Sequence, residues 1–135
     1  MKIVLATLAF LCIPAAQAAT PAELLAGYRA EAVKQSPGYK PSADAGAHLY
    51  SQHFTASGKM PSCVSCHTNE PTRPGRHAVT DKAIKPLSPA ANAERFTDPA
   101  KVEKWFKRNC KDVFDRECTA REKGDVITWL RSLTR

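Results

Sequence analysis

The chain of 135 residues lacks the features that define several large classes of protein. No segment approaches the ~20 consecutive apolar residues that span a bilayer, so no membrane anchor is expected. No internal repeat or low-complexity run is found, and no stretch has the alternating pattern that is typical of a β-strand. Methionine is scarce, because Met1 and Met60 are the only two. These absences favour an all-α domain and leave almost no methionine for a functional site.

The first 18 residues are predicted to be a cleaved signal peptide. Lys2 supplies a positive charge, residues 3–16 form a short apolar run, and Ala16-Gln17-Ala18 gives the small-x-small pattern at which signal peptidase cleaves. Residues 19–135 are then expected to form a single domain. The leader looks bacterial, which predicts export to the oxidising periplasm.

The charge of the chain is basic. Lys and Arg number 20 against 13 Asp and Glu, and the loss of Lys2 with the leader lowers the net charge from +7 to +6. In the periplasm nucleic acid is not an expected partner. Acidic electron-transfer partners or anionic membrane surfaces fit better, although evenly spread positive charge is also typical of a solvated surface.

Local signals predict four helices and one long loop. Thr20-Pro21-Ala22-Glu23 has the N-cap, the first-turn proline and the glutamate of a capping box, and its helix should end before Pro37. The other helices are expected from Ser42 towards Phe54, from Asp98-Pro99 to about Cys110 with Val102, Trp105 and Phe106 on one face, and from the capping box at Thr119. The proline-rich segment 69–89 is a loop long enough to wrap a cofactor.

One short motif carries the chemistry. In Cys63-Val64-Ser65-Cys66-His67, two thiols three positions apart on a helical turn can each add to one vinyl group of a porphyrin. The histidine that follows is then held under the iron. We therefore predict one covalently attached haem c, bound through Cys63 and Cys66, with His67 as an axial ligand. Its Nδ1 is expected to donate to the carbonyl of Pro71 or of Pro74.

The cysteines have two alternative interpretations, a zinc site and a thioredoxin-like redox pair. Cys63, Cys66, Cys110 and Cys118 together could ligate zinc, but the last two lack a C-x-x-C spacing, and periplasmic thiols tend to oxidise. A thioredoxin-like pair would need a surrounding βαβ pattern, which is missing. The leader and the helical context favour haem.

The second axial position is less plainly marked. Electron-transfer cytochromes c usually use a methionine well after the haem motif, and Met60 precedes it, so such ligation is excluded. Cys110 and Cys118 should form a disulfide in the periplasm, and closing this loop would contribute roughly 2.5 kcal/mol. Two interpretations of this disulfide are open: it only joins two helices, or it also stiffens the segment that presents Asn109 to the iron. The remaining candidates are His48, His53, His77, Asn109, a lysine, or no protein ligand.

A larger set of residues resembles a known family. It comprises Arg95-Phe96-Thr97-Asp98, Val102-Glu103, Asn109-Cys110, Cys118 and Glu122-Lys123, with Cys-Val-Ser-Cys-His-Thr-Asn upstream. This set, spread between Ser42 and Leu133, is similar to the sphaeroides haem protein family, oxygen-binding c-type cytochromes with a class I cytochrome c core. The resemblance implies that fold with an extra N-terminal helix, His67 and Asn109 as axial ligands, and a Cys110–Cys118 disulfide. The related cytochrome c″ type has histidine at the position of Asn109.

The expected function follows from this ligand pair. A carboxamide oxygen is a weak-field donor, so reduction should free Asn109 and open a site for O2, NO or CO. We therefore predict a periplasmic, high-spin monohaem cytochrome that takes part in electron transfer and binds gases, rather than a dedicated enzyme. The resemblance implies a dihaem cytochrome c and a membrane cytochrome b as redox partners. A plain electron shuttle and an oxygen- or nitric-oxide-converting oxidoreductase are the alternatives.

Overall fold

A computed structural model of the chain describes residues 19–54 and 58–134, so the predicted signal peptide lies outside the described residues. The described elements are α1 (Pro21–Gln35), α2 (Ala43–Ser51), α3 (Val64–His67), β1 (Gly75–Arg76), β2 (Ala83–Ile84), α4 (Pro99–Phe114) and α5 (Ala120–Ser132). The predicted all-α class is confirmed. Among the described residues, no helix is both long and apolar enough to cross a bilayer.

The helix starts lie where the capping signals predict them. The Thr20 hydroxyl accepts from the Glu23 N–H while the Glu23 carboxylate accepts from the Thr20 N–H, and Thr119 and Glu122 form the same reciprocal pair at α5. The Asp98 side chain caps α4 by accepting from the third residue of the helix. Each cap satisfies backbone donors that have no partner inside the helix.

The extents of two helices differ from the prediction. α2 ends at Ser51 rather than near Phe54. α4 continues past Cys110 to Phe114 and ends only where Asp115 takes a left-handed conformation, with a φ of 56°. Neither end is marked by glycine or proline, so the sequence gives no stop signal there.

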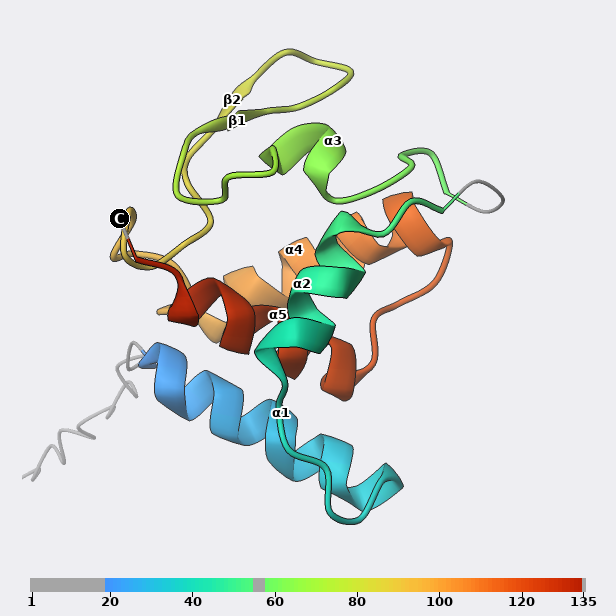
Figure 1. Cartoon of the computed structure of the whole chain (residues 1–135), viewed down its shortest axis with the longest axis vertical. Helices are drawn as coiled ribbons and strands as arrows, with labels where there is room; N and C mark the ends of the chain where they lie inside the picture. Colours follow the sequence, from blue (N-terminus) through green and yellow to red (C-terminus); the bar gives the residue numbers. More distant parts are fainter. Residues whose placement is uncertain (1–18, 55–57, 135) are drawn as a thin grey trace, which may run out of the picture.

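The prediction that no strands occur was wrong for a small part of the long loop. β1 and β2 pair antiparallel, with Gly75 opposite Ile84 and Arg76 opposite Ala83. Each strand has two residues, which is too short for an alternating pattern to register in the sequence. The hairpin gives the middle of the loop a fixed shape beside α3 (Figure 1).

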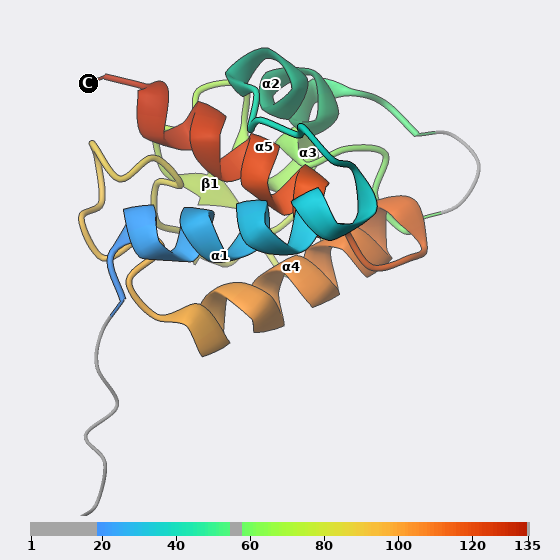
Figure 2. The same ribbon diagram turned by 90° about the horizontal axis from the view of Figure 1, so that it is seen from below.

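Two helices cross closely at the centre of the molecule. Figure 1 shows α2 over α5, with α1 on one side of this crossing and α3 with the hairpin on the other. A Cβ at Gly46 of α2 would lie 2.1 Å from the backbone oxygen of Asp125 in α5, so only glycine allows this approach. In the view of Figure 2, α1 lies between α5 above it and α4 below it.

The apolar core has two clusters of buried side chains. The first consists of Tyr28, Phe96, Ile127 and Leu130, and the second of Cys110, Val113, Phe114 and Cys118. Phe106 packs against both, so α4 joins them. Trp105, predicted on the apolar face of α4, is 42% exposed because it lies at the margin of that face, and the Arg108 guanidinium sits 5.7 Å from its ring centre.

Candidate haem site

The cysteine motif forms a short helix of its own. Cys63 is the N-cap of α3, and Cys66 and His67 are its last two residues. Both cysteines are free thiols and are partly buried. Cys63 packs against the second core cluster, and the Cys66 sulfur accepts a hydrogen bond from the Ala78 N–H at 3.3 Å. Each thiol therefore has its own protein contact, one at the start and one at the end of the same helical turn.

Two contacts hold α3 in place. The Tyr50 hydroxyl on α2 donates to the Thr68 carbonyl at 2.6 Å, and the Tyr50 ring lies 4.7 Å from that of Trp129 on α5. On the other side, a Cβ at Gly75 would lie 2.2 Å from the Cys66 carbonyl oxygen, so β1 runs directly against α3. The α2–α5 crossing and the hairpin together position the motif.

The environment of His67 keeps its imidazole neutral. Burial, the positive charge of Arg95 and the neighbouring His77 together lower the pKa of His67 to about 4, and burial is the largest of the three causes. A histidine must be neutral to offer a ring nitrogen to a metal ion. At neutral pH His67 is therefore in its ligating form.

The structure favours one of the two carbonyls that were predicted to accept a hydrogen bond from Nδ1 of His67. The Pro71 oxygen already accepts from the N–H groups of Leu87 at 2.8 Å and Ser88 at 3.0 Å, which uses both of its lone pairs. This favours Pro74 of the two carbonyls that the sequence left open.

Asn109 lies on α4, directly before a disulfide. It is half-buried, and the next residue, Cys110, is bonded to Cys118 with a Cα–Cα distance of 5.6 Å. The disulfide links the last turns of α4 to the start of α5 and is buried in the second core cluster. Because Cys63 packs against the same cluster, the fold brings the cysteine motif and the turns of α4 around Asn109 to one region.

The other candidate residues have different places. His48 and His53 are exposed, on α2 and just after it. One ring nitrogen of His77 accepts from the Val79 and Thr80 N–H groups, each at 3.2 Å, which commits it to the turn of the hairpin. Met60, expected on the attachment side, packs against the second cluster.

The donor set fits a covalent haem better than its rivals. Cys110 and Cys118 are bonded to each other, so zinc cannot have four thiolate ligands. Within the described part of the chain, no three His, Cys, Asp or Glu side chains gather as a metal site would require. Two free thiols and one neutral imidazole on a single turn match covalent haem attachment. Half-buried apolar side chains from the loop, α4 and α5 pack against the first core cluster and could cover a porphyrin: Leu87, Val102, Phe106 and Trp129.

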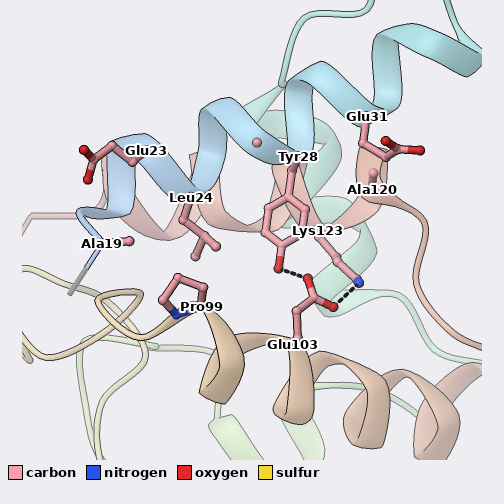
Figure 3. Close-up of a pocket in the computed structure, with 10 residues that line it drawn as sticks. Ala19, Glu23, Leu24, Tyr28, Glu31, Pro99, Glu103, Ala120 and Lys123 are labelled. Atoms are coloured by element: carbon pink, nitrogen blue, oxygen red, sulfur yellow. Dashed lines mark hydrogen bonds and ion pairs between the residues drawn. The ribbon is translucent and has the colours of Figure 1, made fainter. Parts of the chain in front are cut away.

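An open pocket of about 550 Å³ lies away from this site. It is bounded by α1, α4 and the start of α5, and none of its lining residues belongs to the cysteine motif (Figure 3). At its base the Tyr28 hydroxyl and the Lys123 ammonium both donate to the Glu103 carboxylate. This pocket is therefore not the haem site.

The helical fold and the thiol–imidazole turn define a c-type cytochrome. Residues 37–130 match the model of a family described as a domain of unknown function, DUF1924. The chain is 45% identical over 113 residues to the cytochrome c-type protein SHP of Cereibacter sphaeroides, covering 82% of each protein. It is 42% identical over 96 residues to cytochrome c″ of Methylophilus methylotrophus, covering 70% of this chain and 67% of that protein.

Solved structures agree with these relatives. Oxidised SHP, described as an oxygen-binding cytochrome c, superposes with a TM-score of 0.78 at 42% identity, over 86% of this chain and 99% of the other. Oxidised cytochrome c″ gives 0.77 at 38% identity, over 85% and 95%. A solution structure of cytochrome c″, described in terms of haem-ligand detachment, gives 0.75 at 38% identity, over 85% and 94%. The chain belongs to the family of SHP and cytochrome c″, which confirms the predicted family and cytochrome fold and implies haem c as the cofactor.

Sequence reasoning gave no role to two residues of this region. Tyr50 lies within the predicted second helix and was given no role there, yet its hydroxyl donates to the Thr68 carbonyl at the end of α3. Arg95 was noted only within the family resemblance, yet its charge acts on His67. No sequence pattern connects a single charged residue in a loop to a histidine 28 positions earlier, so the effect of Arg95 on His67 could not be predicted.

Proposed function

We propose that this chain is a periplasmic monohaem c-type cytochrome whose ferrous form binds diatomic gases and which exchanges electrons with other cytochromes. The observation that carries the proposal is the turn of α3, where two free thiols flank a neutral imidazole beside the turns of α4 that hold Asn109. When bound, haem supplies a one-electron iron centre that can take a small ligand.

On the attachment side, the protein supplies three groups. The sulfurs of Cys63 and Cys66 would hold the haem covalently, each as a thioether to one vinyl group. His67 offers one ring nitrogen to the iron and donates from the other to a backbone carbonyl, for which Pro74 is the candidate. Such a hydrogen bond fixes the tautomer and the orientation of the ring.

On the opposite side, Asn109 acts as a displaceable ligand. Its carboxamide oxygen is neutral and donates weakly, so its hold depends on the positive charge of the ferric state. Asn109 would therefore hold ferric iron and not ferrous iron, and its amide would then be available to donate a hydrogen bond to a small ligand. The descriptions of the relatives, oxygen binding for SHP and haem-ligand detachment for cytochrome c″, support this reading.

The outer face of α4 is the part of the surface best suited to an acidic redox partner. Five exposed cations follow one another along this helix: Lys101, Lys104, Lys107, Arg108 and Lys111. Lys107 and Lys111 are paired with acidic side chains, whereas Arg108 lies over the exposed ring of Trp105. A patch of one sign attracts a partner of the opposite sign. Partners of the kind that the family resemblance implies, a dihaem cytochrome c and a membrane cytochrome b, would dock there.

Visible spectra of the oxidised, reduced and carbon monoxide-treated reduced protein test the proposal. We expect a high-spin ferrous spectrum at neutral pH and rapid binding of carbon monoxide, because Asn109 does not hold the reduced iron. A low-spin ferrous spectrum that carbon monoxide does not change would instead indicate a plain electron shuttle. Steady consumption of oxygen or nitric oxide under a supply of electrons would indicate an enzyme.

A further inference from the structure

Arg95 is a half-buried cation that forms no ion pair in the described structure, although the nearby Glu94 attracts it electrostatically. It lies in the loop between β2 and α4, and none of the ion pairs among the described residues includes it. The adjacent carboxylate, Glu94, is exposed and pairs instead with Lys85 at 3.2 Å. A charge removed from water is unfavourable unless an opposite charge accompanies it. The surroundings of Arg95 therefore leave room for an anion.

The guanidinium of Arg95 is held by neutral acceptors. Its Nε donates to the Pro86 carbonyl at 2.7 Å, and one terminal nitrogen donates to the Lys85 carbonyl. These bonds fix the plane of the group but do not balance its charge. Arginine has five N–H donors, so the rest of the fork is free to bind a ligand within the described structure.

The loop places Arg95 beside the haem motif. The chain next to Pro86 is joined to the Pro71 carbonyl by the N–H groups of Leu87 and Ser88, and Pro71 follows His67 by four residues. Because the Arg95 Nε donates to the Pro86 carbonyl, the guanidinium is tied to the same stretch of chain that is bonded to Pro71. Directly after Arg95, the buried Phe96 has a φ of 63°, a rare conformation for a bulky residue, and its ring anchors this turn in the first core cluster.

We propose that the Arg95 guanidinium binds a propionate carboxylate of the haem. An arginine fork matches a carboxylate with two parallel hydrogen bonds, and the propionates are the anions that a haem on α3 would bring. The inference rests on the proposed function, since it requires haem at Cys63 and Cys66. It gives Arg95 a cofactor-binding and positioning role rather than a catalytic one.

This role has a measurable electrostatic consequence. A fixed positive charge near the haem favours the ferrous state, which carries one positive charge fewer than the ferric state. Loss of the guanidinium also leaves the propionate charge unbalanced, which favours the ferric state further. The guanidinium therefore raises the midpoint potential, and its loss lowers it. We expect a change of about tenfold in the ratio of ferric to ferrous protein at a given potential, and tenfold corresponds to 59 mV for a one-electron couple.

Three variants of the full-length holoprotein test the proposal. Arg95→Gln removes the charge and retains an N–H donor for the Pro86 carbonyl, while Arg95→Lys keeps the charge and loses the fork. Arg29→Gln is the matched control, because Arg29 is exposed on α1 and its loss changes the net charge equally. The measurements are the midpoint potential by spectroelectrochemical titration and the propionate bending band by resonance Raman spectroscopy, which responds to hydrogen bonding of the carboxylate.

We expect Arg95→Gln to lower the midpoint potential and to shift the Raman band. Arg95→Lys should keep most of the midpoint potential and still shift the band. Arg29→Gln should change neither. If Arg95→Gln fails to mature, the band shift in Arg95→Lys decides. A band that stays at the parent position in the mature Arg95 variants overturns the proposal and leaves Arg95 as a brace for the loop. Parent protein that carries no covalent haem after denaturation would instead refute the proposed function itself.

Discussion

Asn109 shows how much can depend on one side chain in this molecule. It precedes Cys110, whose disulfide to Cys118 is buried, so its backbone belongs to a well-fixed part of α4. A short carboxamide at this position has few conformations, and its oxygen is a weak donor. Replacement by the imidazole that the cytochrome c″ type carries would make the same backbone present a strong ligand.

Substitution of Asn109 in two directions tests its role as a ligand. In Asn109→Ala the ferric iron should be five-coordinate or bind water, and azide should bind faster than in the parent protein. In Asn109→His the ferric form should move towards low spin, because imidazole is the stronger-field donor. Visible spectra and stopped-flow azide binding measure both effects. Unchanged spectra and kinetics in both variants would assign the sixth position to water, a lysine or another histidine.

At the scale of elements, the starts of the helices were predictable and the crossing that positions the site was not. Thr20, Asp98 and Thr119 cap their helices through contacts within three residues, so the sequence contains the whole signal. The two-residue strands and the end of α4 depend on packing against distant parts of the chain. Likewise Cys63, Cys66 and His67 are neighbours in sequence, whereas Arg95 reaches His67 only through the folded loop.

The α2–α5 crossing can be tested at its closest point. Gly46→Ala should destabilise the protein by more than 2 kcal/mol, because the new methyl group would meet the Asp125 backbone oxygen, which cannot move without shifting α5. Gly27→Ala is the matched control, since a Cβ there meets nothing within 4 Å, and it should stabilise α1 by about 0.5–1 kcal/mol. Denaturant unfolding measures both. Equal stabilities of the two variants would show that α2 and α5 do not approach so closely.

The disulfide between α4 and α5 makes a second test at this scale. Thiol titration of the unfolded, unreduced holoprotein should find no free thiol, because the proposed haem attachment would consume Cys63 and Cys66, and Cys110 is bonded to Cys118. The variant Cys110→Ala/Cys118→Ala should lose roughly 2.5 kcal/mol of stability, since its unfolded chain is no longer cross-linked. Two titratable thiols per parent chain would contradict the disulfide.

At the scale of the whole molecule, two polar junctions add to the apolar packing that joins α1 to the rest of the protein. The Glu103 carboxylate of α4 accepts from Tyr28 of α1 and from Lys123 of α5, so one side chain connects three helices (Figure 3). At the other end of α1, Tyr39 in the link to α2 donates to the buried carboxylate of Asp125 at 2.7 Å. These polar contacts fix the position of α1 relative to α4 and α5.

The Glu103 junction predicts how stability varies with pH. Burial raises the pKa of Glu103, but the hydrogen bonds from Lys123 and Tyr28 outweigh this effect, and the pKa in the folded state is lower than the ordinary value of 4.5. A carboxyl with a lowered folded pKa stabilises the protein above its ordinary pKa, and this contribution is lost as the pH falls through the folded value. The junction should therefore contribute its full stability at pH 7 and lose it progressively as the pH falls below 4.5.

Glu103→Gln tests this dependence. The variant leaves the Lys123 ammonium, whose side chain is 12% exposed, without a charged partner, so we expect a loss of about 1–2 kcal/mol at pH 7. The difference from the parent should shrink as the pH falls from 5 to 3, because the parent carboxylate becomes protonated as well. Glu31→Gln is the control: Glu31 is an exposed residue of α1 that pairs with Lys34, and its loss should cost less than about 0.5 kcal/mol. Urea unfolding at several pH values measures all three proteins. A Glu103→Gln deficit that stays constant from pH 7 to pH 3 would mean that the carboxylate charge does not hold α1, α4 and α5 together.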